Sequence, residues 1–174
     1  MQLSFLSAAM VFVASNAVAQ HAHQLNSTSE TGGQSQFVAI AEIVSLLRND
    51  PETDWSQVEI KALRDHLVDM DNVTTKALVE RTVDELSATF LITGDEVAAA
   101  SIQRMVLAHS PMLQQSSDWS VLAQEQEGGA KMMIQASSED AFNQVLGLGL
   151  FGLMTIGAHH QQHHLMIATR QSPH

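Results

Sequence analysis

The chain has 174 residues, and 45% of them are hydrophobic, so it is long enough and apolar enough to bury the core of one domain. Its 19 Asp and Glu residues outnumber its 8 Lys and Arg residues. The resulting net charge of −11 argues against binding to nucleic acid or to anionic membranes, and it favours cations. Because the sequence contains no cysteine, disulfide scaffolds, thiolate zinc sites, iron–sulfur clusters and covalently attached haem are excluded.

The N-terminal residues have the pattern of an export signal. Residues 1–19 carry no charged side chain and end in Ala17-Val18-Ala19, which is typical of a signal-peptidase site. Their apolar part is shorter than the about 20 residues that a membrane-spanning helix needs. Residues 20–35 are polar and lack periodicity, which predicts a flexible tether. We therefore expect a signal peptide (1–19), a tether (20–35), one domain (36–170) and a periplasmic or secreted location, with no integral membrane span.

Helical periodicity is present in four segments of the domain. Apolar side chains three and four residues apart predict helices over about 36–48, 55–70, 94–110 and from the cap at 137–140 to residue 168.

Capping residues and a proline set the expected helix ends. Thr93 and Glu96 have the spacing of a capping box, and Pro111 is expected to stop the helix that follows them. Ser137 and Asp140 are the expected caps of the last helix, and Asp54 is the expected cap of the second.

Strand-like segments occur as two pairs, each followed by a predicted helix. The four segments are 73–83, 86–93, 119–126 and 130–136. In the second of these, Ala88, Phe90 and Ile92 alternate and would share one buried face. The predicted fold is α+β, with a duplicated ββα unit that forms a four-stranded antiparallel sheet, helices on one face and one or two helices in front. The alternative is an all-helical bundle with 119–136 as a lone hairpin.

Histidine and methionine residues recur at helical spacing. His66 with Met70, and Met105 with His109, are four residues apart, and the segment HHQQHH contains two further pairs of this kind. Helical neighbours at this spacing lie about 5–6 Å apart at Cβ, close enough for two imidazoles to hold one ion. The candidate ligands are His66, His109, His159, His160, His163, His164, Met70 and Met105. Imidazole with thioether and no thiolate favours copper, with zinc as the other candidate cofactor.

His160 and His164 are the expected central pair, because they would continue the buried line of Leu153 and Ile156 along one helix. His66 or His109 would supply the third ligand, with Cβ atoms within roughly 10 Å of that pair. Affinity should fall as the pH drops through about 6.5, the unperturbed histidine pKa, because a ligating imidazole must be neutral. The competing interpretation is a solvated helix end whose histidines only titrate, with the methionines as core filler.

Other motifs in the sequence give weaker indications of function. Residues 147–152 spell GxGxxG, but they follow a predicted helix instead of a strand, so we attribute these glycines to close packing and not to a nucleotide loop. His21 and His23 form a second candidate copper site if cleavage leaves a free amine just before His21. No hydrolase or two-carboxylate signature is present, so the sequence gives acid–base catalysis little support, and an enzyme is the least favoured function.

Three functions compete at this point. The first is an exported metal-binding protein that stores, delivers or detoxifies copper. The second is a non-catalytic interaction module of the cell envelope, with an envelope protein as its partner. The third is a b-type haem binder with His and Met as axial ligands, which requires no cysteine.

Overall fold

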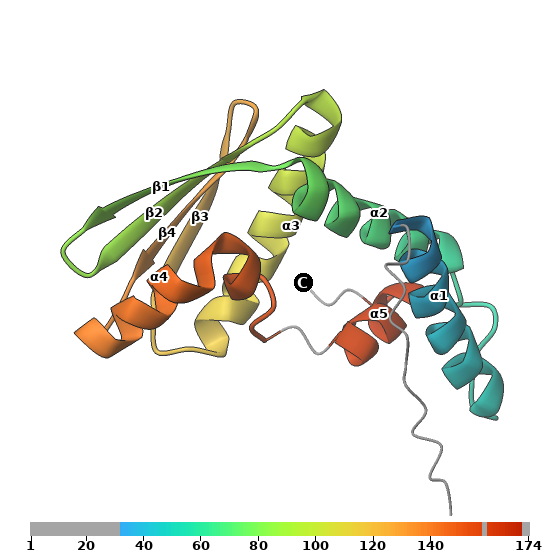
Figure 1. Ribbon diagram of the computed structural model, residues 1–174. Helices are drawn as coiled ribbons and strands as arrows, with labels where there is room; N and C mark the ends of the chain where they lie inside the picture. Colours follow the sequence, from blue (N-terminus) through green and yellow to red (C-terminus); the bar gives the residue numbers. More distant parts are fainter. Residues whose placement is uncertain (1–31, 158–159, 172–174) are drawn as a thin grey trace, which may run out of the picture.

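The computed structural model describes residues 32–157 and 160–171, which form five helices and four strands (Figure 1). The helices are α1 (Gly32–Asn49), α2 (Ile60–Lys76), α3 (Glu96–Gln115), α4 (Glu139–Leu153) and α5 (His160–Ala168). The strands are β1 (Leu78–Asp84), β2 (Ser87–Thr93), β3 (Ser120–Gln126) and β4 (Gly129–Gln135). The expected signal peptide and most of the expected tether lie outside the described residues, whereas residues 32–35 already belong to α1.

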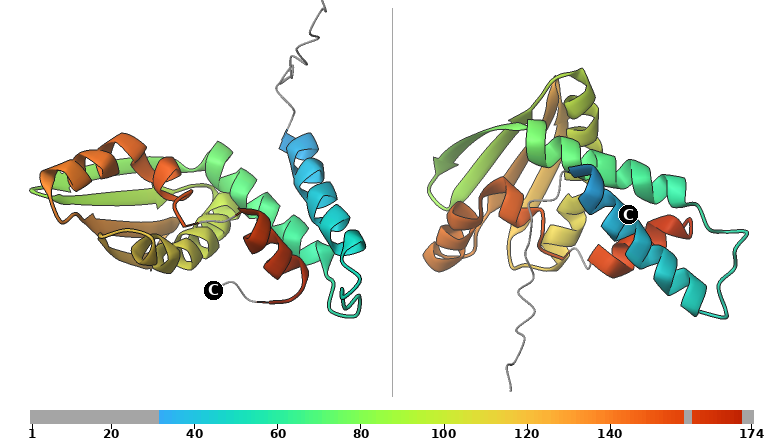
Figure 2. Two further views of the ribbon diagram at one scale, coloured as in Figure 1. Left: turned by 90° about the horizontal axis from the view of Figure 1, so that it is seen from below. Right: turned by 45° about the vertical axis from the view of Figure 1, so that its right-hand side comes forward.

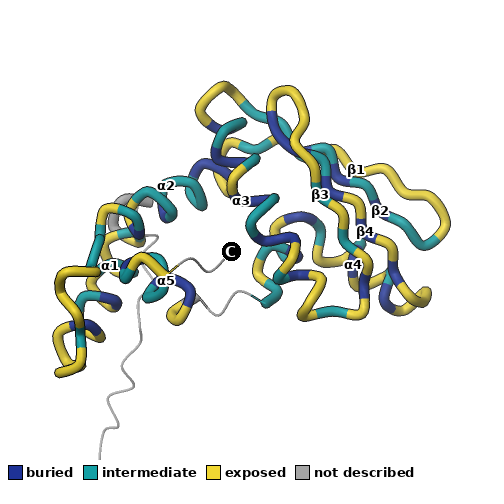
Figure 3. The backbone as a smooth tube through the Cα atoms, turned by 180° about the vertical axis from the view of Figure 1, so that it is seen from behind, coloured by how far each residue is buried: buried dark blue, intermediate teal, exposed yellow. Residues whose placement is uncertain are grey.

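The strands form one antiparallel sheet in the order β1-β2-β4-β3. The two hairpins meet through β2 and β4, where Phe90 lies opposite Met132. Alternate residues of these central strands are buried: Ala88, Phe90, Ile92, Ala130, Met132 and Ile134. Both α3 and α4 pack against this face (Figure 2), whereas β1 is exposed along most of its length (Figure 3). The predicted α+β class and the predicted inward face are therefore confirmed.

The apolar side chains form two clusters. The larger cluster fills the space between the sheet, α3 and α4. The smaller cluster, which we call the arm cluster, joins α1, α2 and α5 through Ile43, Leu47, Leu63, Leu67 and Ala168. Met70 packs against both clusters, so α2 runs from one to the other (Figure 1).

The all-helical alternative is wrong, because β1 and β2 form a second hairpin that pairs with the first through β4. The order hairpin then helix does occur twice, as β1-β2-α3 and β3-β4-α4, but an origin by duplication stays a prediction. Among the described residues, none of the helices combines the length and apolar character required to cross a membrane.

The second helix begins later than expected. α2 begins at Ile60 instead of residue 55, because the Asp54 side chain closes a local turn by accepting hydrogen bonds from Ser56 N (3.0 Å) and Ser56 Oγ (2.7 Å). Such short side-chain bonds offer the backbone an alternative to the helix. At its other end α2 continues to Lys76, since Val73 is buried in the larger cluster. The strand predicted from residue 73 therefore begins only at Leu78.

The third helix differs from the prediction at both ends. Its N-cap is Asp95, whose side chain accepts a hydrogen bond from Ala98 N at 2.8 Å, so the capping box of Thr93 and Glu96 was wrong. α3 also continues through Pro111 to Gln115. Pro111 removes one backbone donor, but Leu113, only 2% exposed, anchors the last turn in the core.

The prediction of one long last helix was also wrong, because the chain breaks between α4 and α5. The N-cap of α4 is Ser138, whose hydroxyl accepts a hydrogen bond from Ala141 N at 3.2 Å, in place of the expected caps Ser137 and Asp140. Gly149 interrupts α4 with φ 56°, and Gly157 follows it with φ 77°. Both values lie in the left-handed region, which glycine adopts without steric cost. The break lets the chain turn toward α2 before α5 begins (Figure 2).

Candidate functional site

Four histidine rings from three helices lie together where α2, α3 and α5 meet. His163 of α5 is central: its ring centre is 4.9 Å from that of His66 and 5.5 Å from that of His109. The His164 ring centre lies 5.7 Å from His66 and 6.2 Å from His163. His66 and His109 face each other at 6.2 Å with nearly parallel rings, inclined by 14°. We call these four residues the histidine cluster.

The cluster is largely inaccessible to water. His109, His163 and His164 are only 6%, 5% and 8% exposed, and His66 is half-buried. A solvated helix end would leave such side chains in water, so that interpretation is wrong for His163 and His164. Burial of an imidazole requires compensating polar interactions, which makes a group of buried histidines a feature with a specific role or a specific partner.

The expected central pair was partly misplaced. We expected His160 and His164 to continue the buried line of α4, but α5 is a separate helix, and His163 is the residue that lies between His66 and His109. The side chain of His160 and all of His159 lie outside the described residues. His164 does lie beside His66, with its ring centre 5.7 Å away, as expected of the pair and one of the two candidate third ligands.

The orientation of the His109 ring is fixed by its own helix. Its Nδ1 lies 2.9 Å from the carbonyl oxygen of Met105, one turn earlier. Because a carbonyl can only accept, Nδ1 must carry the proton, and in the neutral ring the lone pair then lies on Nε2. A backbone carbonyl bound to one ring nitrogen is the usual way in which proteins orient a histidine that ligates metal through the other.

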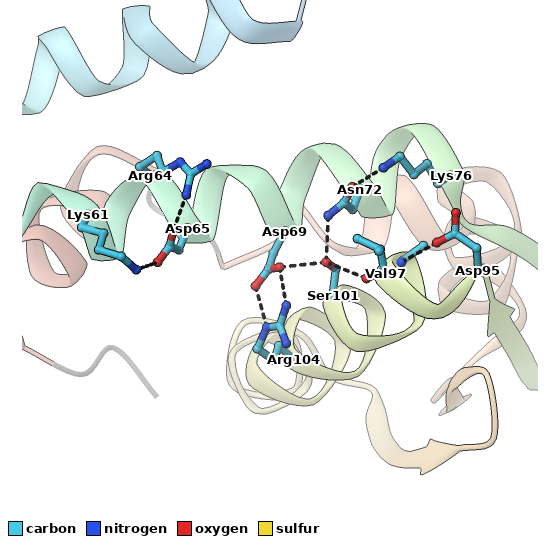
Figure 4. Close-up of polar contacts among 11 residues, drawn as sticks. Lys61, Arg64, Asp65, Asp69, Asn72, Lys76, Asp95, Val97, Ser101 and Arg104 are labelled. Atoms are coloured by element: carbon cyan, nitrogen blue, oxygen red, sulfur yellow. Dashed lines mark hydrogen bonds and ion pairs between the residues drawn. The ribbon is translucent and has the colours of Figure 1, made fainter.

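A polar network fastens α2 to α3 beside the cluster (Figure 4). Arg104 donates from Nε and Nη2 to the two carboxylate oxygens of Asp69, both at 2.7 Å. Ser101 Oγ donates to Asp69 at 2.8 Å and accepts from Asn72 Nδ2 at 3.0 Å. Asp69 lies one helical turn after His66, so this network sets the register that brings His66 opposite His109. The sequence did not predict this network, although the three-residue spacing that places Asp69 on the same side of the helix as His66 was visible.

The Asp69 carboxyl is tuned by the same contacts. Burial by itself raises its pKa, but the hydrogen bonds from Arg104 and Ser101, together with the charges of Arg104 and His66, outweigh burial, and the pKa is lowered. The pKa of Arg104 is raised in turn, chiefly by its hydrogen bond to Asp69. Asp69 therefore stays ionised, and the charge of Arg104 balances its negative charge within the pair.

The two candidate methionines lie in apolar surroundings. Met105 is 6% exposed within the larger cluster, and Met70 packs against both clusters. Packing accounts for their positions, and ligation by their thioethers stays a prediction.

The spacing of the rings can be compared with that of metal ligands. An imidazole bonded at about 2 Å places its ring centre about 3 Å from the ion, so two rings on a tetrahedral ion have centres about 5 Å apart. The observed separations, 4.9–6.2 Å, are close to this value. As the side chains stand, however, no three His, Asp or Glu residues within 32–157 and 160–171 form a group ready to hold a metal ion. The imidazoles would therefore have to change rotamer in order to share one.

We compared the chain with known protein families, curated proteins and solved structures. No protein-family model matches the sequence, and no curated protein or solved structure matches it.

Proposed function

We propose that this protein binds a transition-metal ion at the histidine cluster, and that it acts in the storage, delivery or tolerance of that metal outside the cytoplasm. The observation that carries the proposal is the meeting of four imidazoles from three helices at ring separations of 4.9–6.2 Å. Residues that are distant in sequence share this position, which chance placement of histidines on amphipathic helices does not explain. The extracytoplasmic location rests on the pattern of residues 1–19.

The donor set favours copper and accepts zinc. Neutral imidazoles suit Cu²⁺ and Zn²⁺, and at nitrogen sites the affinity for Cu²⁺ exceeds that for Zn²⁺. Four imidazoles would fill the coordination shell of a tetrahedral ion and leave no position open for a substrate. Such a site suits holding a metal better than catalysis.

The direct test is a calorimetric titration of the untagged protein with Cu²⁺ and with Zn²⁺ at pH 7.5. We expect one ion per chain with a dissociation constant well below millimolar. The variants His109→Ala and His163→Ala should each weaken binding at least about 10- to 100-fold, the loss typical even for a residue that only supports a metal ligand.

Two controls separate ligation from packing. Ser110→Ala changes the residue after His109, a buried serine whose hydroxyl donates to Val106 O, and should leave affinity unchanged. Met70→Leu conserves the volume of the side chain and removes only the thioether. If Met70→Leu weakens metal binding while Ser110→Ala does not, the Met70 thioether is a ligand. Binding no tighter than millimolar by the wild-type chain, or equal binding by His109→Ala and wild type, would overturn the proposal.

A further inference from the structure

The helix α5 is attached to the molecule mainly on its α1–α2 side. Its Ala168 is fully buried in the arm cluster with Leu63 and Leu67 of α2. Leu165 and Ile167 also pack against that cluster. In the described part of the chain, the larger cluster beneath the sheet includes no residue of α5.

The hydrogen bonds and the ion pair of α5 are likewise made on its α1–α2 side. Glu59 N donates to Ala168 O at 2.7 Å, and the Glu59 carboxylate accepts from Arg170 Nε at 2.9 Å. At the other end of the helix, Gln161 Nε2 donates to Glu42 Oε1 of α1. These three bonds join α5 and the residues after it to α1 and to the start of α2.

Toward α3, by contrast, α5 presents imidazoles. The ring of His163 lies 5.5 Å from the ring of His109, which belongs to the helix that packs on the sheet. The histidine cluster therefore spans the boundary between the arm cluster and the sheet layer.

From this placement we infer that the bound metal ion is a cross-link that fastens α5 to α3, so that metal binding and the docking of α5 are coupled. The inference rests on the proposed function, because it requires an ion ligated by both His109 and His163. A ligand that binds only the docked arrangement stabilises that arrangement in proportion to its saturation, and every contact that docks α5 then raises the affinity for the ligand.

The coupling makes a prediction for residues that do not touch the metal. Arg170→Ala removes the ion pair with Glu59 and leaves the four histidines of the cluster unsubstituted. Because this pair is partly exposed, its loss should weaken metal binding by up to about fivefold. Arg48→Ala, in the last turn of α1, removes the same charge from an exposed side chain and is the matched control. The control should bind as tightly as wild type.

The structural test is hydrogen–deuterium exchange of the full chain, with and without saturating Zn²⁺, which is redox-inert. Amides in residues 161–169 should exchange at least about tenfold more slowly with zinc. In His109→Ala, at zinc concentrations that saturate the remaining ligands by calorimetry, zinc should no longer slow exchange of the amides around residue 109 of α3, whereas residues 161–169, still joined to α2 through His66 and His163, keep part of their protection.

The outcomes separate the two proposals. If wild type binds zinc by calorimetry but exchange in α5 does not change, the cross-link is wrong and metal binding stands. If metal-free Arg170→Ala exchanges residues 161–169 faster than Arg48→Ala does, and the two variants nevertheless bind zinc equally, the coupling is likewise overturned. Absence of zinc and copper binding would overturn both.

Discussion

Gly157 controls the path from α4 to α5, and its replacement by alanine should destabilise the protein. The residue has φ 77°, a conformation that costs an L-amino acid about 1–2 kcal/mol. An added Cβ would lie 2.5 Å from Ser116 Oγ and 2.9 Å from the carbonyl oxygen of Met112. Because the second neighbour is backbone, one of the two segments must move, at a typical cost of about 1–3 kcal/mol.

The two contributions together predict a loss of about 3 kcal/mol in the free energy of unfolding for Gly157→Ala. At about 2–4 °C per kcal/mol for a chain of this size, the melting temperature should fall by about 6–12 °C. The assay is urea unfolding followed by circular dichroism, with thermal melts in parallel. Weaker zinc binding should accompany the loss, since Gly157 directs the chain toward the helix that carries His163.

Gly147→Ala is the matched control. Gly147 lies inside α4, and apart from its chain neighbours and the adjacent backbone of the helix no atom lies within 4 Å of the position its Cβ would take. This substitution should stabilise the protein by about 0.5–1 kcal/mol, because alanine loses less conformational freedom in a helix. The reasoning would be refuted if Gly157→Ala unfolded within about 0.5 kcal/mol of wild type, or if the two variants lost the same stability.

Two further predictions concern the core and the α2–α3 network. Phe90→Ala, at a position only 1% exposed, should cost about 3–5 kcal/mol in urea unfolding, whereas Thr89→Ala on the opposite face should cost far less; equal losses would contradict the assigned faces. Asp69 has a lowered pKa when folded, so its contribution is present above the unfolded value of 3.8 and is lost as the pH falls through the folded value. Unfolding at pH 6 and pH 3 should therefore show Asp69→Asn less stable by up to about 1 kcal/mol at pH 6, with a smaller difference at pH 3; a constant difference would contradict the role of Arg104.

The sequence by itself determined the parts of the fold that depend on local pattern. Alternation placed Ala88, Phe90 and Ile92 on the buried face, and the strand-like segments 119–126 and 130–136 marked the second hairpin. Apart from the break between α4 and α5, the order of helices and strands followed from periodicity, because each element must bury one apolar face. The acidic composition and the recurrence of histidine at helical spacing were likewise readable from the chain alone.

Element ends and the site itself were decided by tertiary contacts. Pro111 did not stop α3, because burial of Leu113 outweighs one lost backbone bond. The glycines near the end of α4 are visible in the sequence, but the sequence does not show that the chain turns at them. The close approach of α3 to Gly157 in the folded protein gives the reason for the turn.

The same break changed the composition of the candidate site. In one continuous helix His160 and His164 would have shared a face with Leu153, whereas in the separate α5 the ring of His163 lies between His66 and His109. Spacing along the chain relates residues within one helix, but it contains no information on how three helices cross. The docking of α5 on α1 and α2, and the Asp69–Arg104 pair between α2 and α3, supply that information.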